Sequence, residues 1–363
     1  MTVVSELHES HGATFTERGG RRVVDHYGRP ERVHRAVRNV VGTIEMGYGV
    51  VEVTGSDRVD FVDNAVSNRV PEEDSRGVYA LLLDPQGRIE TELYVYNADE
   101  KLLCFVPPGA AAELAKEWDE KTFIQDVTVR AASDDFGVFG VHGPKATEKV
   151  ASVLTGPSSP DEPLSFVRGR IGGWGVTVVR TDDLTGEEGY EVICAAADAA
   201  NVFDALINHG LNAAPFGYRT LEYLYLEAGT PRFETELAGT VPNVLGLRNA
   251  LDFEKGCYVG QEVVSKIENR GQPSRRLVGL ELEFDAIPTG GAAVFDGDGH
   301  VGEVTRADYS PSLDAPIALA LVDYGLEAGE LTVRVGGDDV GAAVVDLPFV
   351  EGSSRSGRLP QYP

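Results

Sequence analysis

Two hydrophobic patterns alternate along the first 275 residues. Apolar residues recur at helical spacing in several segments, each with one apolar stripe: 30–41, 57–66, 110–120, 144–156, 198–210 and 218–228. Shorter runs with apolar residues in alternation or in series predict strands at 49–54, 78–83, 88–96, 102–106, 174–180 and 189–194. This mixture of helices and strands predicts an α+β fold.

The pattern changes after residue 276. Helical periodicity disappears, and short alternating segments follow between glycine-rich turns: 277–284, 292–295, 300–305, 317–322, 331–335 and 340–346. Such a series predicts a small antiparallel barrel or sandwich. The chain therefore divides into four parts: a polar N-terminal segment (1–28) that we expect to be mobile or loosely docked, an α+β domain (29–275), a β domain (276–350) and a disordered tail (351–363).

The composition is strongly acidic. The 363 residues carry a net charge of −26, and arginine supplies 25 of the 32 basic residues. An acidic surface with little lysine resembles proteins of salt-loaded cytoplasms, such as those of haloarchaea, and it argues against non-specific nucleic-acid binding. The exception is the segment 263–280, which holds Lys266, Arg270, Arg275 and Arg276. This excess of positive charge is compatible with a local basic pocket.

Cysteine usage and the lack of long apolar runs predict the compartment. Cys104, Cys194 and Cys257 are too few and too widely spaced for a disulfide scaffold or a zinc site, so we expect a reducing environment. We find neither a membrane-length apolar run nor a signal-peptide pattern, and we expect a soluble, cytoplasmic protein. The pair His8 and His11 lacks acidic or cysteine partners at a suitable spacing, so we expect no metal site.

The segment 253–272 contains the densest group of reactive and turn-forming residues. Gly256 and Gly260 bracket Cys257, which indicates a sharply turned backbone, and the charge of Lys255 would favour a reactive thiolate. The alternative is a tight turn whose glycines serve packing and whose cysteine is a small buried hydrophobe. The residues alone leave both interpretations open.

Residues 255–262, Lys-Gly-Cys-Tyr-Val-Gly-Gln-Glu, with the arginines at 270, 275 and 276, resemble the signature of the YgfZ family. These proteins are folate-binding relatives of the glycine-cleavage T-protein, an aminomethyltransferase. Further segments resemble that superfamily in the same order: 61–68, 79–89, 141–144, 180–191 and 226–231. The resemblance implies a ring of three domains, two interleaved α+β lobes and a C-terminal barrel, with tetrahydrofolate in the central hole.

The resemblance also implies site residues. Glu191 falls where T-proteins place the carboxylate that holds the pterin, and a carboxylate can accept two parallel N–H bonds from such a ring. Glu92 falls at their catalytic aspartate, where it would either serve or be an ordinary solvated residue of a strand. Tyr225 replaces an arginine that grips the ligand's carboxylate end, and tyrosine cannot form that charged pair. Arg232 or Arg270 could supply the missing charge.

Asn68, Tyr225, Gln261 and Arg270 join Glu191 as expected folate-binding residues, with Cys257 and Glu92 as expected catalytic ones. The resemblance implies a tetrahydrofolate-binding protein that supports iron–sulfur enzymes or tRNA modification, with iron–sulfur proteins as partners. The alternative is a folate-dependent aminomethyltransferase or demethylase in which Glu92 is the acid–base group. A third interpretation is an interaction scaffold whose hole no longer binds a ligand.

Overall fold

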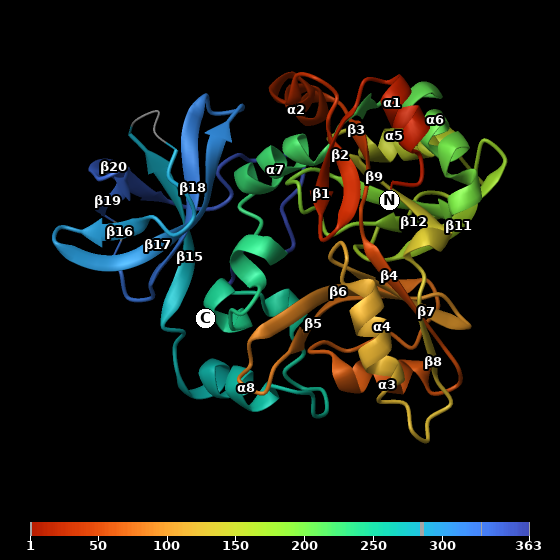
Figure 1. Cartoon of the computed structure of the whole chain (residues 1–363), viewed down its shortest axis with the longest axis horizontal. Coiled ribbons are helices and arrows are strands. Elements are labelled where there is room, and N and C mark those ends of the chain that lie inside the picture. Colours follow the sequence, from red (N-terminus) through yellow and green to blue (C-terminus); the bar gives the residue numbers. More distant parts are fainter. Residues whose placement is uncertain (1, 284–286, 328, 363) are drawn as a thin grey trace.

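The computed structural model describes residues 2–283, 287–327 and 329–362. Two α+β lobes and a β-barrel lie around a common centre, with the barrel to one side of the two lobes in the view of Figure 1. The predicted α+β fold with a C-terminal antiparallel barrel is therefore confirmed. None of the helices in the described ranges is long and apolar enough to cross a membrane.

The first lobe is built on a seven-stranded sheet with the order β10-β11-β12-β13-β9-β3-β14. Its strands are β3 (Gly42–Glu45), β9 (Phe136–His142), β10 (Leu154–Thr155), β11 (Phe166–Ile171), β12 (Trp174–Arg180), β13 (Gly189–Ala195) and β14 (Ala214–Pro215). Helices α5 (Ala146–Val153) and α6 (Ala199–Asn208) bury their apolar stripes on this sheet, where Phe203 packs against Phe139. The helical spacing of their apolar residues accounts for this packing.

The second lobe is built on a five-stranded sheet with the order β5-β6-β7-β4-β8. Its elements are β4 (Gly49–Thr54), α3 (Arg58–Ala65), β5 (Arg76–Leu83), β6 (Ile89–Asn97), β7 (Lys101–Val106), α4 (Ala111–Asp119) and β8 (Thr128–Ala131). Trp118 of α4 is buried against Phe61 of α3 in the core of this lobe.

The two lobes are interleaved in sequence. The chain leaves the first sheet at the end of β3 and returns to it along β9, and the whole second lobe lies between these points. The backbone N–H of Met46 donates to the carbonyl of Val138 at 2.8 Å, so the outgoing and returning segments lie side by side. The second lobe is thus an insertion connected through two adjacent crossings.

The barrel closes in the order β15-β18-β17-β16-β19-β20. Its strands are β15 (Arg275–Leu282), β16 (Ala293–Asp296), β17 (Gly299–Ser310), β18 (Ala315–Asp323), β19 (Glu330–Val335) and β20 (Asp338–Val345). Each corresponds to one of the six segments predicted from alternation, although Phe284, at the end of the first predicted strand, lies outside the described residues. A closed barrel leaves no strand edge exposed, which suits short strands with many turns.

The N-terminal segment is firmly docked, whereas the sequence predicts a mobile or loosely docked terminus. It forms α1 (Ser5–Ser10), β1 (Thr14–Arg18) and β2 (Arg21–His26), followed by α2 (Pro30–Asn39). The buried ring of His8 lies between two partners, with Nε2 2.6 Å from Oε2 of Glu45 and Nδ1 2.6 Å from the hydroxyl of Tyr27. These buried hydrogen bonds attach the N-terminal segment to the first lobe, although its polar sequence predicts that it is exposed to solvent.

The expectation of a disordered tail is also wrong for residues 351–362; Pro363 lies outside the described residues. The backbone N–H of Ser353 donates to Glu187 at 2.9 Å, that of Gly357 to the carbonyl of Asp182 at 2.7 Å, and that of Gln361 to the carbonyl of Gly246 at 2.9 Å. The tail is ordered because its polar groups pair with groups on the rest of the chain rather than with water.

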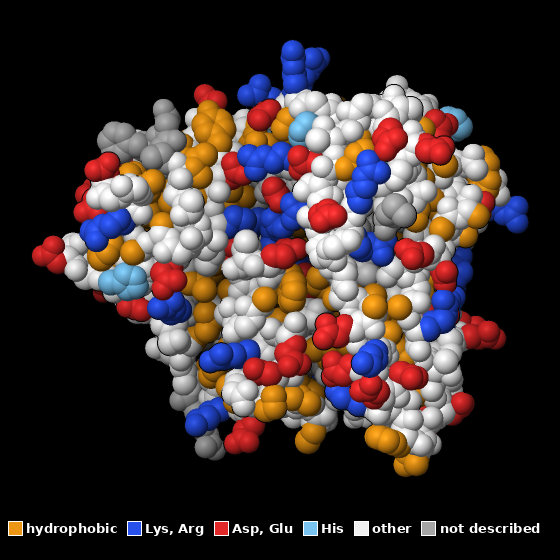
Figure 2. Space-filling view, in the orientation of Figure 1, with side chains coloured by type: hydrophobic (Ala, Val, Ile, Leu, Met, Phe, Trp, Pro, Cys, Tyr) orange, Lys and Arg blue, Asp and Glu red, His pale blue; other side chains and the backbone are white. Residues whose placement is uncertain are grey.

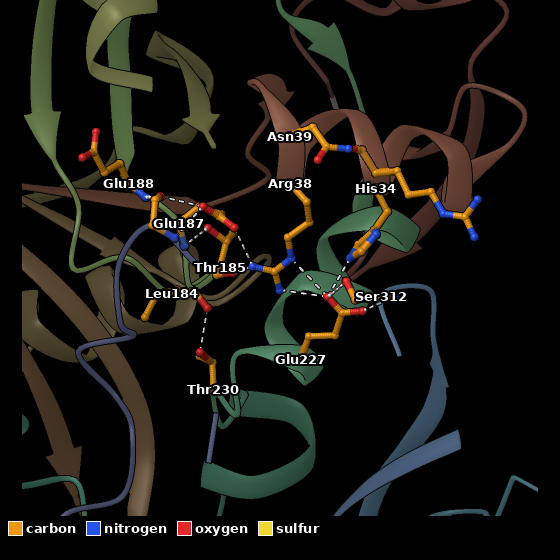
Figure 3. Close-up of polar contacts among 12 residues, drawn as sticks. His34, Arg38, Asn39, Leu184, Thr185, Glu187, Glu188, Glu227, Thr230 and Ser312 are labelled. Atoms are coloured by element: carbon orange, nitrogen blue, oxygen red, sulfur yellow. Dashed lines mark hydrogen bonds and ion pairs between the residues drawn. The ribbon is translucent and has the colours of Figure 1, made fainter. Parts of the chain in front are cut away.

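Helix α7 (Tyr218–Glu227) ends in a buried carboxylate that joins α2 to the barrel (Figure 3). Glu227 accepts hydrogen bonds from Nε2 of His34 at 2.8 Å and from Nε and Nη2 of Arg38 at 3.1 and 2.9 Å. It also accepts from the hydroxyl of Ser310 at 2.6 Å and from the backbone N–H and hydroxyl of Ser312 at 3.0 and 2.9 Å. Burial alone would raise the pKa of Glu227, but His34 and Arg38 lower it to about 2.

We predict that Glu227→Gln lowers the free energy of unfolding at pH 7 by about 3 kcal/mol. An amide lacks the charge that Arg38 faces and offers fewer acceptor positions. The pKa of Glu227 lies below its ordinary value of 4.5, so its contribution is present above about pH 4.5 and is lost as the pH falls toward 2. Denaturant unfolding across this pH range measures both effects.

The matched control is Glu117→Gln on α4. Glu117 is half exposed and pairs with Lys121 just beyond the same helix, so its replacement should change the free energy of unfolding by less than about 0.5 kcal/mol. Equal unfolding midpoints for the wild type and Glu227→Gln at pH 7 would show that the junction does not depend on this charge.

Candidate functional site

A cavity of two adjoining chambers lies where the two lobes meet α7. The space that the centres of water-sized groups can reach is about 80 Å³ in the outer chamber and about 10 Å³ in the inner one. They share five lining residues: Met46, Tyr48, Tyr94, Leu184 and Tyr225. The mostly apolar lining is typical of small-molecule sites.

Charged side chains surround the mouth of the outer chamber. Arg18 and Arg232 both pair with Glu222 of α7, and Nη2 of Arg232 lies 3.1 Å from Glu234. Figure 2 shows basic and acidic side chains gathered in the recess between the barrel and the lobes. The rim is thus a network of ion pairs rather than a surface of one sign.

Glu92, on β6, lines the outer chamber and is held by two partners. The hydroxyl of Tyr79 donates to Oε2 of Glu92 at 2.9 Å, and Nη1 of Arg358 lies 2.5 Å from the same oxygen. Arg358 comes from the tail, is 5% exposed, and lies 4.2 Å over the ring of Tyr79 and 5.3 Å over that of Tyr94. Burial raises the pKa of Glu92, and the charge of Arg358 and the hydrogen bond from Tyr79 oppose this rise.

Glu191, on β13, lines the inner chamber and is 6% exposed. The hydroxyl of Tyr48 donates to its Oε1 at 2.7 Å. Burial raises the pKa of Glu191 to about 7, although the hydrogen bond from Tyr48 opposes the shift. Among the described residues only Tyr48 donates to this carboxylate, so it retains acceptor positions for the N–H groups of a ligand.

Three of the residues expected from the sequence come together in this cavity: Glu92, Glu191 and Tyr225. A positively charged side chain that the sequence did not indicate, Arg358, also lines the outer chamber, where it pairs with Glu92. Arg232 lies at the mouth, and the side chain of Arg270 lies outside what the structure describes. In the described part of the chain, no three side chains are grouped in a way that could hold a metal ion.

The chain matches two family models over most of its length. The GCVT N-terminal domain matches residues 4–255, and the glycine cleavage T-protein C-terminal barrel domain matches residues 275–351. The chain belongs to the glycine cleavage T-protein family.

Relatives that are named aminomethyltransferase match this chain over nearly its whole length. An aminomethyltransferase of Saccharopolyspora erythraea is 31% identical over 361 residues, covering 96% of this chain and 97% of the relative. One of Cutibacterium acnes is 32% identical over 369 residues, covering 97% and 98%. The crystal structure of glycine cleavage system aminomethyltransferase T from Bartonella henselae superposes with a TM-score of 0.85 at 24% identity and covers 98% of both chains, which confirms the fold.

Cys257, which the resemblance implies as a catalytic residue, lies outside the T-protein-type cavity. It is exposed in the loop before α8 (Gln261–Arg270) and is not among the described residues that line either chamber. Lys255 does not serve the thiol, because its Nζ donates to the carbonyls of Asp63, Val66 and Asn68 at 2.6, 2.9 and 2.9 Å. A lysine so placed satisfies carbonyls at the end of α3.

The glycines of this loop also have a packing role. Gly260 has φ +80°, and a Cβ there would lie 2.6 Å from the carbonyl oxygen of Asp84, so only glycine fits against that turn. Asn68 donates from Nδ2 to the carbonyls of Tyr79 and Asn249, each at 2.9 Å. Gln261 donates to the carbonyl of Lys255 at 3.4 Å. Asn68 and Gln261 therefore stabilise backbone and do not line the cavity as expected.

Sequence reasoning missed Arg358 and Tyr48. Arg358 lies in a polar tail with no periodic pattern, and Tyr48 lies between two glycines at a strand start. The surplus of buried tyrosines on β6, which includes Tyr94 and Tyr96, was the available signal for a polar cavity, because a buried hydroxyl needs a partner.

We predict that Arg358→Gln and Glu92→Gln each lower the free energy of unfolding at pH 7, Arg358→Gln by about 3 kcal/mol, because it leaves a buried carboxylate without its cation. The double variant should recover part of this loss, with a coupling energy of about 1–3 kcal/mol in a double-mutant cycle.

Arg355→Gln is the matched control in the same tail, since Arg355 is 64% exposed and pairs with Glu351, which is equally exposed. Strict additivity of the two single changes would contradict an ion pair between Arg358 and Glu92. Denaturant titration of the four proteins and the control is the measurement.

Proposed function

We propose that the chain binds tetrahydrofolate in its central cavity and transfers a one-carbon unit to or from it, as an aminomethyltransferase or a related demethylase. The observation that carries the proposal is the pair of carboxylates, Glu92 and Glu191, in one tyrosine-lined cavity that also holds Arg358. Membership of the T-protein family supports the ligand, and the name aminomethyltransferase of the relatives supports the reaction class.

Glu191 is the group that would hold the head of the ligand. Its carboxylate has acceptor positions left after the bond from Tyr48, and a pterin presents adjacent ring and amino N–H groups to such an acceptor. Such donors favour the charged form of Glu191 and offset the burial that raises its pKa. The rings of Tyr48, Tyr94 and Tyr225 supply flat apolar walls for the heterocycle.

Glu92 is the group that would move a proton at the reacting nitrogens of the folate. Its Oε2 is fixed by Tyr79 and Arg358, so the longer glutamate has one defined position in the cavity. Burial raises the pKa of Glu92, and the charge of Arg358 opposes this rise. A carboxyl group whose pKa is raised can donate a proton as well as accept one. Arg18 and Arg232 lie at the mouth, where the ligand's carboxylate end would leave the cavity.

We predict that the purified protein binds 5-formyl-tetrahydrofolate and that Glu191→Gln weakens this binding by roughly 10- to 100-fold, the value of a hydrogen bond to a charged group. Wild-type affinity should fall by about tenfold per pH unit below pH 7, because protonation removes the carboxylate form. The affinity of Glu191→Gln should lack this dependence. Isothermal titration calorimetry from about pH 5.5 to 8 measures both, at low and at high KCl, because the acidic surface is typical of salt-loaded cytoplasms.

Glu90→Gln, an exposed neighbour of the site on β6, is the matched control and should bind as the wild type does. If the wild-type protein does not bind the folate, the folate function is rejected and the interpretation as an interaction scaffold remains. Formation of methylene-tetrahydrofolate from an aminomethyl-loaded lipoyl carrier protein, or from a methylamine donor, separates transfer from binding alone.

A second function is favoured by the segment 255–262 with its exposed cysteine. In this proposal the chain is a YgfZ-like protein that binds tetrahydrofolate and supports iron–sulfur enzymes or tRNA modification, with iron–sulfur proteins as partners. Cys257 supports it because its thiol is exposed and lies outside the folate cavity, where a partner protein can reach it.

This second function predicts that Cys257→Ser in the host lowers the activity of an iron–sulfur enzyme such as aconitase toward the level of the deletion strain. Glu254→Gln, an exposed neighbour in the same loop, is the control and should retain activity. Full aconitase activity in the Cys257→Ser strain, together with its loss in the deletion strain, rejects a role for the thiol.

A further inference from the structure

His142, the last residue of β9, is a buried polar side chain without a partner. It is 4% exposed, and neither Nδ1 nor Nε2 forms a hydrogen bond within the described part of the chain. Its ring lines the inner chamber of the cavity together with Glu191, Thr181 and Asp182. Buried polar groups are nearly always paired, so an unpaired imidazole in a cavity wall calls for an explanation.

The backbone around His142 is built to make room for this ring. Its register partners on the two neighbouring strands are both glycines, Gly42 in β3 and Gly189 in β13. A Cβ at Gly189 would lie 2.8 Å from Nδ1, and a Cβ at Gly140 would lie 2.5 Å from Nε2. The imidazole therefore occupies a niche that larger residues at Gly140 and Gly189 would close, beside the edge of Phe216.

The charge state of His142 follows from its surroundings. Burial, with a smaller effect from the charge of Arg180 on β12, lowers the pKa of His142 to about 4. The other ionisable groups that face the inner chamber include the carboxyls of Glu191 and Asp182, whose pKa values are raised by burial. At neutral pH the imidazole is therefore uncharged, with one nitrogen as a donor and the other as an acceptor.

The size of the inner chamber limits what can meet His142. The free space beside the ring has room for about one group of the size of a water molecule, so a whole heterocycle does not fit there. A single polar substituent of a ring that lies between Tyr48, Tyr94 and Tyr225 does fit. Because those side chains line both chambers, a ligand in the outer chamber can extend such a substituent inward.

We propose that His142 is a specificity-determining residue that hydrogen-bonds to an amino or oxo substituent on the heterocycle held by Glu191. This inference rests on the proposed folate function and deepens it. Glu191, when charged, accepts only, whereas His142 both donates and accepts, so together they select a ring with N–H donors and an adjacent polar substituent. A flat ring of the same size without that substituent leaves His142 unpaired and binds more weakly.

Two substitutions test this role with 5-formyl-tetrahydrofolate as the probe. His142→Leu removes the unpaired polar group, so it should raise the unfolding midpoint of the ligand-free protein and yet weaken binding by roughly five- to tenfold, the value of one neutral hydrogen bond. His142→Gln keeps one donor and one acceptor and should bind within about threefold of the wild type. A residue that only packs would gain stability on change to leucine without losing affinity.

His209→Leu is the matched control, because His209 has an exposed side chain at the end of α6 and should leave affinity unchanged. If His142→Leu does not fold, His142→Met takes its place. Its side chain also lacks a donor, so it should weaken binding of 5-formyl-tetrahydrofolate by a similar factor.

The outcomes separate the two proposals. Wild-type binding with unchanged affinity in His142→Leu overturns the role of His142 and leaves the folate function standing. If His142→Leu does not fold, unchanged affinity in His142→Met overturns it in the same way. Absence of wild-type binding to 5-formyl-tetrahydrofolate overturns the folate function and this inference with it.

Discussion

The arrangement of the three parts depends on one buried carboxylate. Glu227 lies at the end of α7, and its two oxygens connect a histidine and an arginine of α2 with two serines at the barrel. A charge with no exposure to water is tolerated only where partners replace its hydration, and these partners come from segments far apart in the chain. The position of α7, which supplies Tyr225 to the cavity, is therefore determined by contacts on both of its sides.

The same constraint explains the cavity. Glu92, Asp182 and Glu191 are largely shielded from bulk water, and each accepts a hydrogen bond from a tyrosine hydroxyl, with Arg358 as the cation among them. Tyrosine suits this task because its ring forms an apolar wall while its hydroxyl satisfies a carboxylate. His142 is the exception, since its two nitrogens have no partner in the described chain, and a cavity wall is the place where an unpaired group can serve a ligand.

Periodicity in the sequence predicts much of the fold. The apolar stripes of α4, α6 and α7 and the alternation of the barrel strands reflect local burial, which is visible in the sequence itself. The cavity depends instead on contacts between distant residues. The resemblance points to Glu92 and Glu191, whereas Arg358 reaches Glu92 from the far end of the chain and belongs to a tail without pattern. Lys255 shows the opposite error. The sequence places its charge beside the thiol of Cys257, whereas its Nζ donates to carbonyls at the end of α3 and Cys257 is exposed outside the cavity.

The insertion of the second lobe between β3 and β9 divides the polar groups of the cavity between two units. The carboxylate of Glu191 and the imidazole of His142 belong to the host sheet, whereas Glu92 belongs to the inserted one. Under the proposed function, the host lobe recognises the heterocycle and the inserted lobe supplies the group that moves a proton. Exchange of the inserted module, through its two adjacent crossings, would give a route to new reactions on an unchanged heterocycle.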